Sequence, residues 1–246
     1  QIVAAVSAGI YVFRGIPVLQ LKARMLVPTA KRTRRQLALG IPVSLQFTIT
    51  SIGSMILQSA VNGFGANVVA AFTAAGRAES ITNIPMSNLA VAASTFVAQN
   101  YGAGQYRRIL TTVRKVFVVD LGLSVLCSLV LFFGGEQIVG LFMTDYNSQI
   151  VYAAKEYLFA ISLCYSLVSV LFVLRNTLQG LGCTYANAVA GAGELIGRIT
   201  VSYLFTPLFG IKAVCFAGPV AWLLADLPLI VLYWRKAKQM RKLSNQ

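Results

Sequence analysis

Lysine and arginine are confined to short clusters along this chain, and long apolar stretches separate the clusters. Most of the 21 basic residues lie at four places, which are residues 22–35, residues 107–115, the single Arg175 and residues 235–242. Loops rich in Lys and Arg remain on the cytoplasmic side of a membrane. The pattern therefore predicts a chain that crosses a bilayer repeatedly, with these four places and the C-terminus in the cytoplasm.

The composition agrees with a membrane protein. Hydrophobic residues make up 57% of the 246 residues, charged residues make up 11%, and the mean hydropathy is +0.72. A soluble domain of this length carries more polar surface. The net charge of +14 lies mainly beside apolar spans, so we expect the basic residues to contact anionic lipid in the bilayer and expect no nucleic-acid partner.

The same composition argues against several kinds of site. There is no histidine, and the four cysteines are scattered without CxxC spacing, so we expect no metal site, no cofactor and no disulfide framework. No GxxxxGK[ST] phosphate loop is present to use ATP. The sequence also lacks paired carboxylates or a nucleophile beside a base, and we therefore expect no enzyme.

A membrane-spanning helix needs about 20 apolar residues. The predicted fold class is an all-α integral membrane protein, a bundle of six transmembrane helices in residues 37–246, preceded by the end of another helix at residues 1–20 and a basic cytoplasmic linker at residues 21–36. The six spans are expected at about 37–60, 68–98, 116–133, 157–178, 186–205 and 214–234. The acid-bearing loop at residues 134–149 is expected outside, and the turn at Cys183 inside. Because the chain starts at Gln1, we expect the protein to be longer at its N-terminus.

Three segments carry a resemblance to a known family. Residues 93–104 read ASTFVAQNYGAG and are followed by YRR at 106–108; residues 178–184 read LQGLGCT; and Leu141-Phe142 precede Asp145. This pattern resembles the second lobe of multidrug and toxic compound extrusion (MATE) transporters. The resemblance implies that the chain is the C-terminal lobe, helices seven to twelve, of a twelve-helix protein, with residues 1–20 as the end of helix six and an N-terminal six-helix lobe as its partner.

The resemblance also implies a function and a location. It implies a multi-pass protein of the cell membrane that exports organic, often cationic, compounds through a central cavity in exchange for H⁺ or Na⁺. Some members have a cation-binding Glu in helix seven and an Asp in helix ten, but this chain has residues near Thr50 and Val168 at those positions. The segments AAGR before Glu79 and ELIGR at 194–198 are similar to the DNA-damage-inducible branch of the family.

Charged residues inside the predicted spans are the first candidates for a site. A charge at the centre of a bilayer costs about 2.5–3.5 kcal/mol even on lenient scales, so it needs a partner or a wet cavity. Glu194 and Arg198 are four residues apart in the order that favours an ion pair. Arg175 is expected at a similar depth on the neighbouring antiparallel helix. These three residues are predicted to form a network, either as a structural clamp or as part of an ion pathway.

Glu79 differs from Glu194 because it has no basic neighbour on its own helix face. Arg77, two residues away, points to another face, whereas Thr82 and Asn83 share the face of Glu79. We expect Glu79 to bind a proton or a cation, unless a base on another helix neutralises it. The ion-coupling candidates are Glu79, Asn83, Glu194, Arg198 and Arg175.

Two polar stripes are candidates for the substrate cavity. They occur at helical spacing in the first and fourth spans and consist of Gln46, Thr50, Ser54 and Gln58, and of Tyr165, Ser166, Ser169 and Asn176. Ordinary contact between membrane helices would use the same residue types. The stripes therefore leave a cavity and plain packing both open.

The resulting prediction is half of a secondary-active antiporter. The alternative within the same superfamily is a flippase for a lipid-linked oligosaccharide or a lipid, in which Arg175 and Arg198 would help to hold pyrophosphate. A passive channel or scaffold half is a further possibility, and an integral-membrane enzyme is the competitor from another class.

Overall fold

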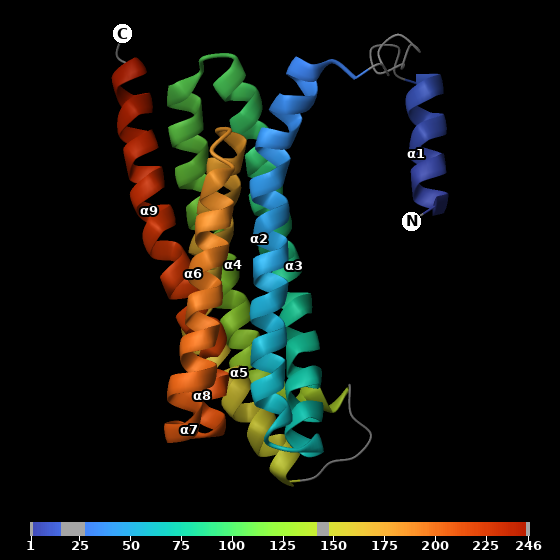
Figure 1. The fold of residues 1–246 in the computed structure, drawn as a ribbon, viewed down its shortest axis with the longest axis vertical. Helices are drawn as coiled ribbons and strands as arrows, with labels where there is room; N and C mark the ends of the chain where they lie inside the picture. Colours follow the sequence, from blue (N-terminus) through green and yellow to red (C-terminus); the bar gives the residue numbers. More distant parts are fainter. Residues whose placement is uncertain (1, 16–27, 142–147, 245–246) are drawn as a thin grey trace. The chain divides into compact units, whose positions relative to one another are not determined.

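The computed structural model of the protein describes residues 2–15, 28–141 and 148–244, and these ranges contain helices and turns but no strand (Figure 1). The chain divides into two units, residues 1–40 and residues 41–246. The helices are α1 (Ile2–Gly15), α2 (Ala30–Asn62), α3 (Ala66–Gly102), α4 (Tyr106–Gly140), α5 (Ser148–Gly180), α6 (Tyr185–Thr200), the π-helical turn η3 (Val201–Phe205), α7 (Thr206–Phe209), α8 (Ile211–Cys215) and α9 (Ala217–Leu243). Helix is the expected form because a bilayer leaves backbone groups no partner except one another.

Four of these helices are long and apolar enough to cross a membrane: α2, α4, residues 150–180 of α5, and α9. The all-α membrane fold class is thereby confirmed for the described residues. Helix α3 is also long, but it carries Arg77 and Glu79 in its first half and continues through Pro85 near its middle. Helix α6 is shorter, and η3 extends it.

The helices extend beyond the spans expected from hydropathy. The span expected at 116–133 lies within α4, which begins ten residues earlier in sequence, at Tyr106, and ends at Gly140. The expectation that the outer loop begins at residue 134 was wrong, because residues 134–140 are helical. A helix can continue into water once it has left the bilayer, so hydropathy marks only the part inside it. The rest of that loop, with Asp145, lies outside the described residues.

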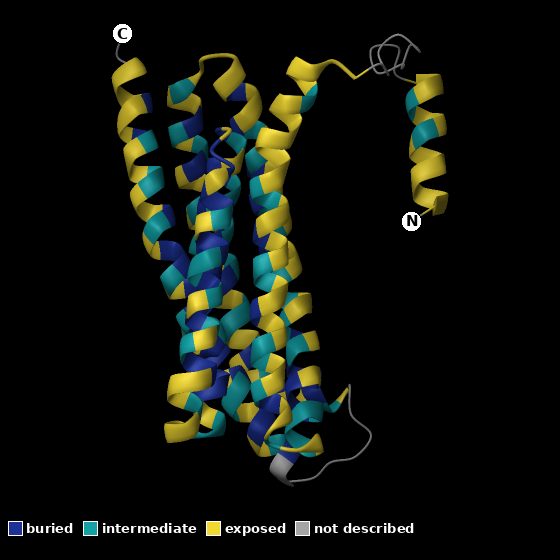
Figure 2. Cartoon of the chain, in the orientation of Figure 1, coloured by how far each residue is buried: buried dark blue, intermediate teal, exposed yellow. Residues whose placement is uncertain are grey.

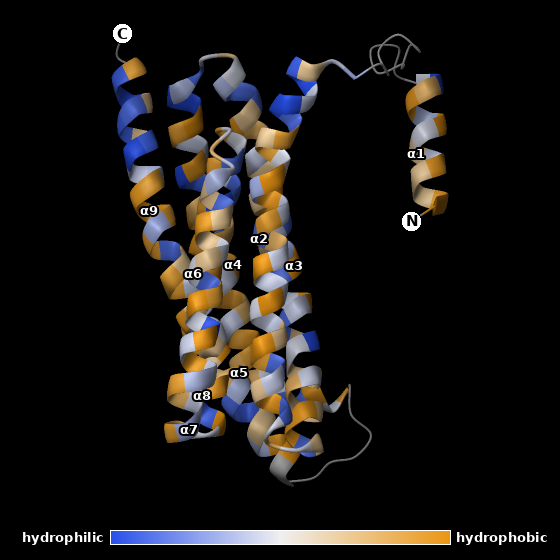
Figure 3. Ribbon diagram, viewed as in Figure 1, coloured by the Kyte–Doolittle hydropathy of each residue, from blue (hydrophilic) through white to orange (hydrophobic). Residues whose placement is uncertain are grey.

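Within residues 41–246, α5 packs against α3, α4 and α9, and α6 packs against α9. Buried side chains such as Met86, Tyr165 and Leu229 lie where these helices meet, while outward faces are exposed (Figure 2). Many exposed side chains are large and apolar, including Val118, Phe133 and Leu163 (Figure 3). An apolar outer face suits contact with lipid chains.

Glycines allow α6 and α9 to touch through their backbones. A Cβ atom on Gly193 would lie 2.7 Å from the carbonyl oxygen of Leu224, and one on Gly197 would lie 2.6 Å from Cα of Ala221. This spacing of small residues is typical of close helix contacts in membranes. Helices α6 and α9 therefore form a tightly joined pair.

Most basic residues of this unit gather at one end. The turn after α3, the turn between α5 and α6, and the C-terminal end of α9 lie together at the top of Figure 1, and the turn after α2 lies at the opposite end. Gly104 and Gly182 have positive φ angles of 70° and 77° in these turns, a conformation that glycine adopts without strain. The basic residues at the start of α4 and the end of α9 therefore share one end of the bundle (Figure 3).

Candidate functional site

Glu79 lies in α3 against two tyrosines of α5. The hydroxyl of Tyr157 donates a hydrogen bond of 2.6 Å to Oε2 of Glu79. The side-chain amide of Asn83 donates one of 3.3 Å to Oε1. The hydroxyl of Tyr165 donates to Oδ1 of Asn83 at 3.0 Å and lies 2.5 Å from the Thr82 hydroxyl. A connected polar cluster therefore joins the two helices in the interior of the bundle.

Aromatic packing holds these tyrosine hydroxyls in place. Tyr165 is fully buried, and its ring meets Trp222 of α9 edge to face at 6.5 Å. The ring of Tyr157 meets Phe72 of α3 edge to face at 4.8 Å. Because packed rings restrict the tyrosine side chains, the Tyr157 hydroxyl is held against the carboxylate of Glu79 and the Tyr165 hydroxyl against Asn83 and Thr82.

No lysine or arginine in the described ranges forms a salt bridge with Glu79. Arg77 is exposed, on a different face of α3. The charge that acts on Glu79 from another helix is that of Arg198. Glu79 is thus a partly buried carboxylate held by neutral donors, with a cation nearby but without direct pairing.

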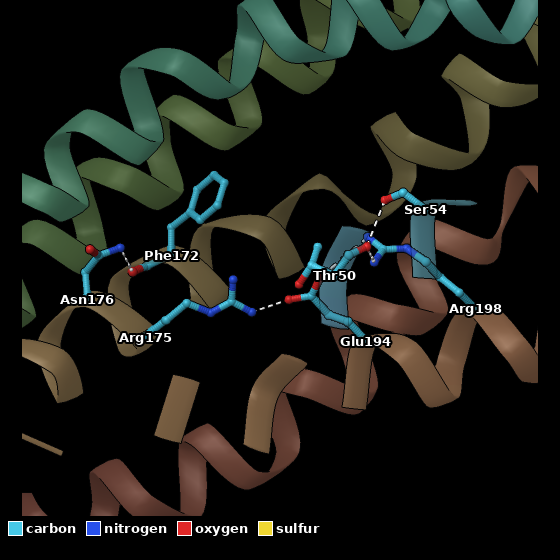
Figure 4. Close-up of polar contacts among 7 residues, drawn as sticks. All are labelled: Thr50, Ser54, Phe172, Arg175, Asn176, Glu194 and Arg198. Carbon is cyan, nitrogen blue, oxygen red and sulfur yellow. Dashed lines mark hydrogen bonds and ion pairs between the residues drawn. The ribbon is translucent and has the colours of Figure 1, made fainter. Parts of the chain in front are cut away.

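A second cluster joins α5, α6 and α2 (Figure 4). Arg175 of α5 pairs with Oε1 of Glu194, which is 3% exposed. Arg198 lies 3.5 Å from Oε2 of the same carboxylate. Arg198 also donates a hydrogen bond of 3.4 Å to the carbonyl oxygen of Thr50. The structure brings together the three residues whose network was predicted from sequence depth.

A glycine makes room for this second cluster. A Cβ atom on Gly53 of α2 would lie 3.1 Å from Cδ and 3.2 Å from Nη1 of Arg198. The side chain of Arg198 can therefore cross the surface of α2 to reach the Thr50 carbonyl.

Two buried carboxyls were missed as site candidates. Asp120 of α4 is 0% exposed, and Ser169 donates a hydrogen bond of 2.8 Å to its Oδ2. Asp226 of α9 is 2% exposed, and neither of its oxygens has a hydrogen-bond partner. A lone acid inside an apolar run was the signal that could have revealed them.

The two polar stripes lie in several environments. Gln46 is buried against Gly191 of α6, whereas Ser54 and Gln58 are exposed. On α5, Ser166 is exposed. The side-chain amide of Asn176 donates a hydrogen bond of 2.9 Å to the carbonyl oxygen of Phe172 (Figure 4). The other stripe members, Thr50, Tyr165 and Ser169, take part in the clusters described above. Whether these residues line a substrate cavity stays a prediction.

The described residues contain no group of three or more His, Cys, Asp or Glu side chains that could hold a metal ion. The chemistry of the interior is therefore that of isolated carboxylates with hydroxyl, amide and guanidinium partners.

The decisive comparison is with protein families. The MatE family model matches residues 42–204, which cover most of α2 to α6 and reach into η3. The chain belongs to the MatE family. The family expected from the motifs at 93–108 and 178–184 is confirmed. The chain is a multi-pass membrane protein of a transporter family and not an enzyme.

Relatives and solved structures agree with the MatE assignment. A probable multidrug resistance protein of Bacillus subtilis, YpnP, is 29% identical over 70% of this chain and 38% of its own length. A probable multidrug resistance protein of Thermotoga maritima, NorM, is 24% identical over 95% of this chain and 51% of its own. A structure described as the outward-facing conformation of a multidrug resistance MATE transporter matches with a TM-score of 0.86 and 17% identity, over 98% of this chain and 55% of that one. The chain thus spans about half the length of the proteins it matches or less.

Proposed function

We propose that this chain is one lobe of a secondary-active antiporter that exports organic compounds in exchange for H⁺ or Na⁺. The observation that carries the proposal is the carboxylate of Glu79, which neutral donors of α3 and α5 hold inside a membrane bundle. An intramembrane acid without a direct counter-charge is a natural site for a proton or a small cation. A second six-helix lobe completes the transporter, which agrees with relatives of about twice this length.

The mechanism follows from what neutralisation does to the Glu79 cluster. With Glu79 ionised, both carboxylate oxygens accept, one from Tyr157 and one from Asn83. A proton on either oxygen adds an O–H donor and makes that oxygen a poorer acceptor, so the hydrogen bond that it accepts from Tyr157 or Asn83 is weakened. Because Tyr157 belongs to α5 and Glu79 to α3, neutralisation changes the contact between two helices. That change shifts the balance between outward- and inward-open states.

The substrate and orientation of the transporter are also proposed. The multidrug names of the relatives support varied organic substrates, bound near the midplane between the lobes. The basic end of the bundle, with the C-terminal end of α9, faces the cytoplasm of the cell membrane. No other cofactor than the coupling ion is required.

The flippase alternative has less support in the structure. It needs basic side chains free to hold a pyrophosphate in the cavity. Both Arg175 and Arg198 are instead paired with Glu194, and their side chains are only 11% and 12% exposed. Their pairing favours the antiporter.

The test is Glu79→Gln in the full-length transporter, reconstituted in vesicles with imposed Na⁺ or pH gradients. Gln mimics the neutral acid, so substrate should still bind while gradient-driven export is lost. Glu136→Gln is the matched control because Glu136 is 42% exposed and pairs with Lys155. Export by Glu79→Gln at the wild-type rate, with unchanged pH and Na⁺ dependence, would refute the coupling role.

A further inference from the structure

The carboxyl of Asp226 stands out among the buried polar groups of the bundle. Its side chain is on α9, is 2% exposed, and offers two acceptor oxygens to which nothing in the described chain donates. An ionised carboxylate in that position would lose its hydration without gaining hydrogen bonds, which is among the most costly arrangements in a protein interior. Burial without donors therefore favours the neutral, protonated form of Asp226 over the carboxylate.

The charges around Asp226 come from the helices packed against α9. Helix α5 supplies Arg175 and α6 supplies Glu194, and both act electrostatically on Asp226. On α4, the carboxyl of Asp120 is bound to Ser169 and is not among the charges acting on Asp226. On α8, Lys212 lies 4.0 Å from Glu156. The π-helical turn η3 carries no charged residue.

Arg175 has N–H donors that its ion pair with Glu194 does not use. Its Nη2 atom pairs with Glu194, while its buried Nε has no partner. A guanidinium has five N–H donors, so the present pairing leaves most of its capacity unused. Arg175 is also the cation whose charge acts on Asp226, so it is the candidate second partner for that carboxyl.

Glu194 would keep a partner if Arg175 moved. Arg198 lies 3.5 Å from its other oxygen, on the next turn of the same helix. The backbones that carry Glu194 and Asp226 are in close contact because Gly193 and Gly197 bring α6 directly onto α9. Arg175, on α5, has a long and flexible side chain. Exchange therefore requires motion of one arginine and leaves the tightly joined helix pair intact.

We propose that Asp226 is a proton-binding site that competes with Glu194 for Arg175. With the proton bound, Arg175 pairs with Glu194, as seen. When the proton leaves, the Asp226 carboxylate takes Arg175, and Arg198 alone holds Glu194. The cluster of two arginines and two acids then changes its net charge from +1 to zero. This site is separate from Glu79, and its test needs neither substrate nor transport.

The experiment is infrared spectroscopy of the full-length protein in lipid nanodiscs, titrated from neutral to alkaline pH. A protonated carboxyl gives a C=O stretch that a carboxylate lacks. The wild type should show a component of this band that Asp226→Asn loses and that disappears as the pH rises. In Arg198→Gln, Glu194 depends on Arg175 alone, so the Asp226 component should persist to higher pH.

Two controls separate this site from the other acids. Asp120→Asn removes the other deeply buried aspartate and should leave the Asp226 component in place. Glu79→Gln should also leave it unchanged, so failure of the proposed coupling role would not affect this result. Identical spectra for Asp226→Asn and wild type across the titration would overturn the proposal, as would an Arg198→Gln component that vanishes at the wild-type pH. The Arg198→Gln comparison keeps Asp226 in place and decides the question even if Asp226→Asn fails to fold.

Discussion

The hydroxyl of Tyr157 donates a hydrogen bond of 2.6 Å to Oε2 of Glu79, and this contact joins α5 to α3 across 78 positions of sequence. It places a neutral donor from one helix on the intramembrane acid of another. A change in the charge of Glu79 therefore alters the hydrogen bond between α3 and α5 directly. The Tyr157–Glu79 pair could in this way couple ion binding to helix motion.

Tyr157→Phe should weaken both stability and transport. The substitution keeps the ring that packs on Phe72 and removes the donor to Glu79. Hydrogen bonds to charged groups contribute about 1.5–3 kcal/mol. Unfolding of the detergent-solubilised protein and export in vesicles measure the two effects. Tyr152→Phe is the matched control, because Tyr152 is on the same helix and 50% exposed. Equal losses in both variants would contradict the specific role of the Tyr157 hydroxyl.

Glu194→Ala should damage folding more than chemistry. It leaves Arg175 and Arg198 without their shared partner in a buried setting, and removal of one member of a buried ion pair costs about 3–5 kcal/mol. The expected result is little monodisperse protein in size-exclusion chromatography. Glu136→Ala should change little, since exposed pairs contribute about 0–1 kcal/mol. A well-folded Glu194→Ala protein that binds substrate without transporting it would instead assign Glu194 to coupling.

Gly197→Ala should separate α6 from α9. The added Cβ would lie 2.6 Å from Cα of Ala221, and backbone atoms cannot move aside as a flexible side chain can. Overpacking of this kind costs about 1–3 kcal/mol, visible as a lower thermal midpoint. Gly122→Ala on α4 is the control, because a Cβ there meets nothing within 4 Å. A Gly197→Ala protein as stable as Gly122→Ala would show that the two helices are not held in this close contact.

The topology predicts opposite labelling of the two ends of the bundle. Cys183 is a poor reporter because it is buried. Exposed positions at the two ends are Gln105, in the turn after α3, and Asn62, at the end of α2. In a background without native cysteines, a membrane-impermeant thiol reagent added to intact cells should label Asn62→Cys and spare Gln105→Cys. The reverse pattern would invert the orientation.

The sequence by itself determined the class of fold and the family. Apolar spans of about 20 residues separated by basic clusters indicate membrane helices, which satisfy their own backbone groups inside a bilayer. The turn motifs at 93–108 and 178–184 indicated the family. The four-residue spacing of Glu194 and Arg198, together with the expected depth of Arg175 in the bilayer, predicted that these three residues form a network. Periodicity along a single helix is enough for such inferences, since residues four apart share a face.

The tertiary structure decided which partner each buried polar group has. The sequence showed that Glu79 lacks a base on its own face, but not that Tyr157 of a distant helix donates to it. Asp226 is a single acid in an apolar helix, and its burial follows from how α9 packs against its neighbours, including α6. Likewise, the polar stripe of α5 faces α3 at Tyr165 and α4 at Ser169. Contacts between helices depend on how the helices rotate and cross, and this geometry arises only when all of them pack together.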